Sequence, residues 1–106
     1  MLILGVAYKA DIGDVRESPG VKVMSYLDRR GAKVSFHDPY VPAVHVDGKF
    51  VERTDLNRRF VEGADCVAIL TPHRLYDLDW VADHASLVFD ARNAYGETRH
   101  ANVVKL

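Results

Sequence analysis

The chain has 106 residues, of which 48% are hydrophobic, which is enough for one compact core but not for two. Its 14 basic and 15 acidic side chains nearly cancel, so net charge provides no attraction to nucleic acid or to an anionic membrane. The single cysteine, Cys66, excludes an intrachain disulfide and a thiolate-only metal site, and it fits the reducing cytoplasm. No apolar stretch approaches the length of a transmembrane segment. We therefore expect one cytoplasmic domain in which any anion binding is local.

The first third of the chain predicts a strand, a loop and a helix. Leu2 to Ala7 form an apolar run without helical period, typical of a strand buried on both faces of a parallel sheet. Because this run begins directly after Met1, we expect the chain to be a piece of a longer protein. A polar loop follows over Lys9 to Glu17. Ser18-Pro19 then predicts a helix start, and Arg29-Arg30-Gly31 predicts its end.

The remaining two thirds alternate short apolar runs with helical segments. Lys33 to His37 predict a second strand that ends at Asp38-Pro39. Asp47-Gly48 predicts a small hairpin within the loop region Tyr40 to Arg53. The later expected elements are a helix from a Thr54 cap through Gly63, a strand over Asp65 to Leu70, a helix from an Asp77 or Asp79 cap to about His84, a strand over Leu87 to Asp90, and a last strand over Val103 to Leu106.

Strands that alternate with helices imply right-handed crossovers and a sheet covered on both faces. The sequence therefore predicts an α/β fold, a three-layer Rossmann-like domain with a mostly parallel sheet over residues 1–106. Ligands of such sheets bind outside the carboxyl ends of the strands. The polar residues expected there are Lys9 to Arg16, Asp38, Thr71 to Arg74 and Asp90 to Asn93.

The loop after the first predicted strand combines two cations, Lys9 and Arg16, with the aromatic ring of Tyr8, ahead of a helix N-terminus. A lysine point charge, a planar guanidinium and free helix amides suit a phosphate and a second oxygen-rich group. The alternative interpretation is that Lys9 and Arg16 are solvated. They would then only neutralise the acidic residues of the same loop, which are Asp11, Asp14 and Glu17.

Two other strand ends have alternative interpretations. Asp38 stands where a dinucleotide fold places its ribose-binding carboxylate, but only Gly5 and Gly13 occur near the first strand, where such a fold needs G-x-G-x-x-G. We therefore interpret Asp38 as a turn residue and disfavour a dedicated NAD fold. Arg92 leaves the last buried strand at the ligand edge. It either contacts a phosphate, ribose or base, or forms a surface ion pair with Asp90 or a neighbour.

The remaining reactive side chains give weaker signals. Cys66 lies inside an apolar strand, which indicates packing rather than a nucleophile. The five histidines are scattered singly, a pattern that predicts no metal site. His37 and His73 lie at strand ends, where a histidine either lines a cleft or is exposed to solvent.

Four sequence blocks, read together, resemble the C-terminal domain of the UDP-glucose/GDP-mannose dehydrogenase family. They are G-V-A-Y-K-A-D-I-G-D-V-R-E-S-P, H-D-P-Y-V-P, A-D-C-V-A-I-L-T and F-D-A-R-N. The resemblance runs in order from about Gly5 to Gly96, and the K-x-x-x-x-D-x-R-x-S-P pattern is specific. The first two blocks are more similar to the UDP-N-acetylhexosamine branch, such as UDP-N-acetylmannosamine dehydrogenase, than to the UDP-glucose branch.

This resemblance implies that the chain binds the UDP part of a nucleotide-sugar. Members of the family oxidise the C6 alcohol of the sugar to a carboxylate in two steps, with NAD and a cysteine nucleophile, for polysaccharide biosynthesis. Their NAD-binding domain and their cysteine precede the segment that resembles this chain, and Cys66 does not match that cysteine. Their main dimer contact is also made by an upstream helical domain. The resemblance thus implies an inactive monomer when this chain is alone.

The resemblance also assigns roles to individual residues. It implies that Lys9 and Arg92 contact the UDP-sugar, with Tyr8 beside Lys9, and that Arg16 reaches across a domain cleft toward NAD. The rival hypothesis is a freestanding regulatory or interaction module of receiver-like topology. A receiver needs a phosphoacceptor aspartate at the end of its third strand, whereas this chain has Thr71-Pro72 there.

Overall fold

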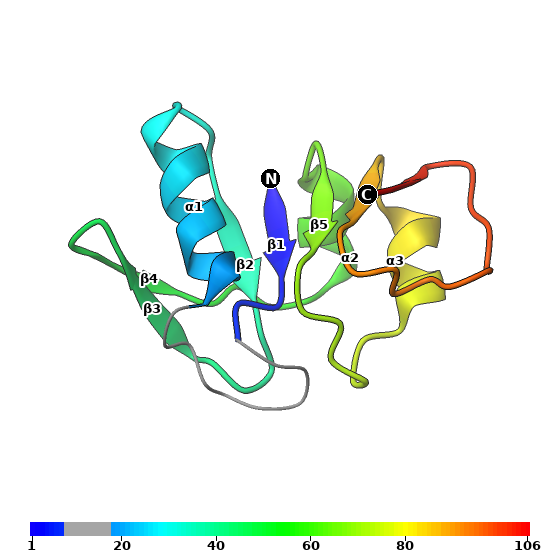
Figure 1. Cartoon of the computed structure of the whole chain (residues 1–106), viewed down its shortest axis with the longest axis horizontal. Helices are drawn as coiled ribbons and strands as arrows, with labels where there is room; N and C mark the ends of the chain where they lie inside the picture. Colours follow the sequence, from blue (N-terminus) through cyan, green and yellow to red (C-terminus); the bar gives the residue numbers. More distant parts are fainter. Residues whose placement is uncertain (8–17) are drawn as a thin grey trace.

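The protein is described by a computed structural model that covers residues 1–7 and 18–106 (Figure 1). Five strands form one sheet in the order β2-β1-β5-β6-β7, and every neighbouring pair is parallel. The strands are β1 (Leu2–Leu4), β2 (Ser35–His37), β5 (Val67–Ile69), β6 (Val88–Asp90) and β7 (Val103–Lys105). The predicted α/β class and parallel sheet are confirmed.

Helices and a hairpin cover the two faces of this sheet (Figure 1). One face packs against α1 (Pro19–Arg29) and the antiparallel hairpin of β3 (Ala43–Val46) and β4 (Lys49–Glu52). The other face packs against α2 (Arg58–Gly63) and α3 (Leu78–His84). The domain therefore has the three layers that the sequence predicts. Within the described ranges, none of the helices has the length and apolar character needed to cross a membrane.

Local sequence explains where most of these elements begin. The Ser18 side chain accepts the Gly20 N–H at 3.1 Å and caps α1, with proline at the first helical position as predicted. Asp47 (φ 51°) and Gly48 (φ 80°) form the turn of the predicted hairpin. Asp77 caps α3 by accepting the Trp80 N–H at 3.1 Å, so Asp77 rather than Asp79 is the cap.

The predicted start of α2 is wrong. The helix begins after Asn57, whose side chain accepts the Phe60 N–H at 3.0 Å. Thr54 instead binds the carbonyl of Phe36, with its backbone N–H at 2.8 Å and its hydroxyl at 3.1 Å. These two bonds hold Thr54 against the end of β2, and the helix begins only after Asn57, three residues further along the chain.

The first strand is shorter than the apolar run that predicted it. β1 ends at Leu4 because Gly5 adopts φ +87°, a conformation that side chains with a Cβ rarely adopt. A Cβ on Gly5 would lie 2.3 Å from the carbonyl oxygen of Thr71. Glycine at this position therefore lets the end of β1 run against the segment after β5.

We predict that Gly5→Ala destabilises the domain by about 3 kcal/mol or more, because the added methyl group meets backbone and the φ angle is strained. Gly31→Ala is the matched control. Gly31 has φ +88°, but a Cβ added to it would meet no atom within 4 Å, so we expect a loss of about 1–2 kcal/mol from the φ angle alone. Urea unfolding of both variants measures the difference, and equal losses would contradict the close approach of Gly5 to Thr71.

Candidate functional site

The strand order reverses between β1 and β5, because the chain passes from β1 to β2 on one side and then to β5 on the other. In open parallel sheets, this reversal leaves a crevice outside the carboxyl ends of the two strands. The segment after β1 carries the predicted residues Tyr8, Lys9 and Arg16, which lie outside the described residues. The predicted Arg92 is described, and it follows β6 at the same edge of the sheet.

The backbone N–H and carbonyl groups of the two described residues that follow Gly5, Val6 and Ala7, are all hydrogen-bonded. The N–H groups of Val6 and Ala7 donate to one oxygen of Asp38, Oδ2, at 2.9 and 3.1 Å. The Ser18 hydroxyl donates to the Val6 carbonyl, and the Thr71 hydroxyl donates to the Ala7 carbonyl at 2.7 Å. The direction in which the chain leaves β1 is thus fixed by three separate segments.

Asp38 is completely buried and makes four contacts with donors. Its Oδ1 accepts the Tyr40 N–H at 2.9 Å, which confirms the predicted turn. Its Oδ2 accepts the two N–H groups after β1 and lies 2.8 Å from His73 Nε2. Because a carboxylate only accepts, the hydrogen in the last contact belongs to the imidazole. With both oxygens engaged inside the protein, Asp38 does not bind a ribose at the surface.

The His73 ring, which contacts this carboxylate, is itself packed against two tyrosine rings. His73 is buried, so it neither lines an open cleft nor faces solvent, and its ring lies edge-on to those of Tyr40 and Tyr76, with centroids at 5.0 and 5.7 Å. The Tyr76 hydroxyl donates to the His37 carbonyl at 2.9 Å. Burial raises the pKa of Tyr76, and the negative charge of Asp38 raises it further. Tyr76 therefore acts as a neutral hydrogen-bond donor rather than as a general base.

Arg92 extends from the end of β6 toward the end of β5. Its guanidinium donates to the Leu70 carbonyl at 3.1 Å. The alternative interpretation of Arg92 is a surface ion pair with Asp90 or a neighbour, and of these partners Asp90 is not available to the guanidinium. Asp90 is completely buried, and it accepts the backbone N–H groups of Arg92 at 3.1 Å, Ala94 at 2.9 Å and Tyr95 at 3.1 Å.

These contacts bring two predicted binding segments together. Ala7, two residues before Lys9, binds the side chain of Thr71, and Arg92 binds the carbonyl of Leu70. Leu70 and Thr71 are consecutive residues after β5. The sequence predicts Asp38, Thr71 and Asp90 at this edge of the sheet, but it does not predict the hydrogen bonds by which they hold the backbone there.

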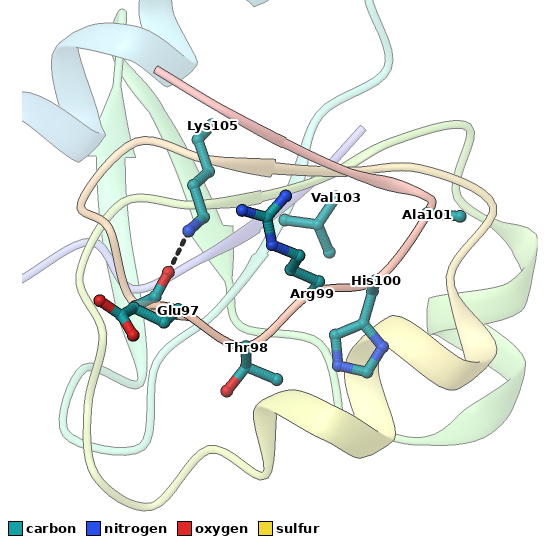
Figure 2. Close-up of a pocket in the computed structure, with 8 residues that line it drawn as sticks. Glu97, Thr98, Arg99, His100, Ala101, Val103 and Lys105 are labelled. Atoms are coloured by element: carbon teal, nitrogen blue, oxygen red, sulfur yellow. Dashed lines mark hydrogen bonds between the residues drawn. The ribbon is translucent and has the colours of Figure 1, made fainter.

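Two hollows are lined by residues of the last part of the chain. One of about 360 Å³ opens beside Arg92 and is lined by Asp90, Ala91, Arg92, Asn93, Lys105 and Leu106. A larger one of about 800 Å³ lies between β7 and the loop before it, with Arg99 and Lys105 among its lining residues (Figure 2). In the larger hollow, Lys105 donates to the Gly96 carbonyl, and His100 lies 2.9 Å from Asp79. Since these groups have partners within the protein, we assign no ligand to that hollow.

The other candidate groups have no catalytic geometry. Cys66 is half-buried, and burial raises the pKa of its thiol, which opposes formation of the reactive thiolate. Among residues 1–7 and 18–106, no cluster of His, Cys, Asp and Glu side chains is suited to hold a metal ion.

Comparison with known proteins identifies the family. Residues 2–97 match the family described as "UDP-glucose/GDP-mannose dehydrogenase family, UDP binding domain". The match covers nearly the whole chain, so the protein belongs to this family, and the chain is its UDP-binding domain.

Relatives of two specificities match at similar identity. A UDP-N-acetyl-D-mannosamine dehydrogenase of Pyrococcus horikoshii is 31% identical over 90% of this chain, and a UDP-glucose 6-dehydrogenase of Bos taurus is 32% identical over 85% of it. The chain spans 22% of the length of each of these relatives. A solved structure of a UDP-D-ManNAc dehydrogenase from Pyrococcus horikoshii matches 98% of this chain with 26% identity and a TM-score of 0.73, and this chain covers 24% of that structure.

We predict that His37 titrates below the ordinary histidine pKa of 6.5, because burial and then the Arg53 charge disfavour its protonated form. Between about pH 6.5 and the pKa of His37 in the folded protein, the unfolded chain binds more protons than the folded chain. The free energy of unfolding therefore decreases as pH falls through this range, and it levels off below the folded pKa. NMR titration measures the pKa. Urea unfolding at about pH 7.5 and about pH 5.5 should show a smaller pH effect in His37→Gln. A His37 pKa above 6.5 would contradict this prediction.

Proposed function

We propose that this chain binds the UDP part of a UDP-sugar at the carboxyl edge of β1, β5 and β6, as the C-terminal domain of an NAD-dependent UDP-sugar 6-dehydrogenase. The proposal rests on two hydrogen bonds to consecutive residues after β5: Thr71 donates to the Ala7 carbonyl, and Arg92 donates to the Leu70 carbonyl. Lys9 follows Ala7 by two residues in the sequence, so both proposed cations, Lys9 and Arg92, belong to segments that are bound to Leu70-Thr71. Two cations near the switch point of a parallel sheet suit a diphosphate.

The proposed division of roles follows the family resemblance. Lys9 and Arg92 contact the UDP-sugar, Tyr8 lies beside Lys9, and Arg16 reaches toward NAD. The protein as a whole would act in the cytoplasm, in polysaccharide biosynthesis. There it would oxidise the sugar C6 alcohol to a carboxylate with NAD as the hydride acceptor. The described residues do not themselves fit a dinucleotide site, since Asp38 is buried and engaged by four donors. We therefore assign NAD mainly to another domain of the parent protein.

In our proposal, this domain recognises UDP and does not select the sugar. Relatives that act on UDP-N-acetyl-D-mannosamine and on UDP-glucose are 31% and 32% identical to the chain. UDP is the part that their substrates share. We therefore assign UDP to this domain, and we assign selection of the sugar to the opposite wall of the cleft.

The receiver-like alternative is compatible with the strand order. Receiver domains share the order in which the second strand neighbours the first and the third follows on the other side. Fold alone therefore does not decide between the two functions. The strand-end chemistry decides: β5 is followed by Leu70 and Thr71, and the hydroxyl of Thr71 is used by the Ala7 carbonyl. A phosphoacceptor carboxylate is thus missing from the position that a receiver requires.

We predict that UDP binds the isolated chain weakly and that Lys9→Ala or Arg92→Ala weakens binding further by about ten-fold or more. Charge-assisted hydrogen bonds contribute roughly 1.5–3 kcal/mol each, which corresponds to that factor. Arg16→Ala is the matched control, because its proposed contact is NAD and it should leave the UDP affinity unchanged. Calorimetry or NMR titration at low salt measures the dissociation constants, and circular dichroism confirms folding of each variant.

The opposite pattern would refute the residue assignment. If Arg16→Ala abolished UDP binding while Lys9→Ala and Arg92→Ala did not change it, the roles given to these residues would be wrong.

We predict that the purified chain, a monomer in our proposal, does not reduce NAD with either UDP-glucose or UDP-N-acetylmannosamine. Cys66 is held in its thiol form by burial, and the described part of the chain has no dinucleotide site, so both the nucleophile and the hydride acceptor would have to come from elsewhere. Absorbance of NADH measures turnover. Steady formation of NADH by this chain alone would show that the catalytic groups are within it.

A further inference from the structure

We propose that Asp38 and Asp90 are positioning residues for UDP recognition, each fixing the backbone of a different cationic contact. Asp38 fixes the chain that leads to Lys9, and Asp90 fixes the chain that carries Arg92. This inference rests on the proposed function. It adds two residues that do not touch the ligand and a division of roles between them.

The two carboxylates are an unusual pair within the described residues. Asp38 and Asp90 are each 0% exposed, and both stand at the carboxyl ends of parallel strands. Burial of a carboxylate is unfavourable unless donors surround it, and apolar side chains often stabilise a core as well or better. Both carboxylates satisfy backbone N–H groups that an apolar side chain would leave unpaired, and most of those groups belong to the segments that lead to Lys9 and carry Arg92. Each carboxylate therefore fixes backbone geometry at the ligand edge while it stabilises the fold.

The geometry around Asp38 determines how the chain leaves β1. A single oxygen, Oδ2, accepts the N–H groups of two consecutive residues, Val6 at 2.9 Å and Ala7 at 3.1 Å. Thr71 donates to the Ala7 carbonyl at 2.7 Å. The backbone of Ala7 is therefore bound at both its donor and its acceptor. In the sequence, Lys9 follows Ala7 by two residues, and in our proposal the direction of this backbone affects the contact proposed for Lys9.

The geometry around Asp90 determines how Arg92 leaves β6. Oδ1 accepts the N–H of Arg92 at 3.1 Å and that of Ala94 at 2.9 Å, while Oδ2 accepts the N–H of Tyr95 at 3.1 Å. The chain between these donors is closely turned, and Asn93 within it has φ 55°. This turn directs the Arg92 side chain toward the Leu70 carbonyl, at 3.1 Å.

Because each carboxylate fixes only one of the two segments, the proposal predicts selective coupling. Asparagine replaces one of the two carboxylate oxygens by an NH₂ group, which cannot accept a backbone N–H. Asp38→Asn and Asp90→Asn therefore each remove part of the acceptor that holds the backbone. We expect Asp38→Asn to weaken UDP binding about five-fold in the otherwise unchanged chain, but less than about two-fold in a Lys9→Ala background. In an Arg92→Ala background, the full five-fold effect of Asp38→Asn should persist. Asp90→Asn should show the reverse dependence.

The experiment is a pair of crossed double-mutant cycles on the 106-residue chain, with UDP as the probe and NMR titration as the measurement. Binding is measured at a temperature where urea unfolding shows every variant to be folded. Val61→Ala is the control for loss of stability, because Val61 is buried in α2 on one face of the sheet and away from the carboxyl edge. It should lower stability and leave the UDP affinity unchanged. If an asparagine variant does not fold, the corresponding serine variant, Asp38→Ser or Asp90→Ser, is used in its place, because serine retains one acceptor oxygen.

The outcomes separate this inference from the proposed function. Equal effects of Asp38→Asn in the Lys9→Ala and Arg92→Ala backgrounds, or an equal effect of Val61→Ala, would overturn the positioning roles while UDP binding stands. Failure of the unchanged chain to bind UDP, or normal binding by both Lys9→Ala and Arg92→Ala, would overturn the proposed function and this inference with it.

Discussion

The carboxylate of Asp38 is the contact on which the carboxyl edge of the sheet depends. It joins the ends of three neighbouring strands, because it belongs to the turn after β2, accepts two N–H groups after β1, and contacts His73 after β5. Loss of this acceptor would leave buried donors unpaired, at a cost of about 1–3 kcal/mol for each. The same stretch of chain approaches its other neighbour closely, since a Cβ on Gly5 would lie 2.3 Å from the Thr71 carbonyl oxygen.

The first helix is tied to the same place. Ser18 caps α1 through the Gly20 N–H and also donates its hydroxyl to the Val6 carbonyl. A Cβ on Gly20 would lie 2.9 Å from the Val6 Cα, so glycine allows the helix start to press against the end of β1. The predicted cations Lys9 and Arg16 therefore lie in sequence between Val6 and Ser18, which are hydrogen-bonded to each other. The amides at the start of α1 add partial positive charge beside those two points.

Local patterns predicted the elements, whereas long-range contacts decided their ends. Ser18-Pro19 and Asp47-Gly48 act through their own neighbours, so both were predicted correctly. Thr54 was misassigned because its partner, the carbonyl of Phe36, lies in another strand. Asp38 was predicted as a turn residue from the proline that follows it. Its burial was not predicted, because three of its four donors come from residues more than 30 positions away.

The site divides two tasks between two kinds of charged residue. Asp38 and Asp90 are buried and use their charge on backbone N–H groups, where the low dielectric strengthens each contact and fixes geometry. Arg92 keeps its guanidinium at the surface, where it donates to a carbonyl, and that contact does not neutralise its positive charge. An exposed cation is screened by water and salt until something covers it. In the function that we propose, this domain forms one wall of a cleft and orients a diphosphate, and most of the binding energy is realised only when the opposite wall closes and excludes water.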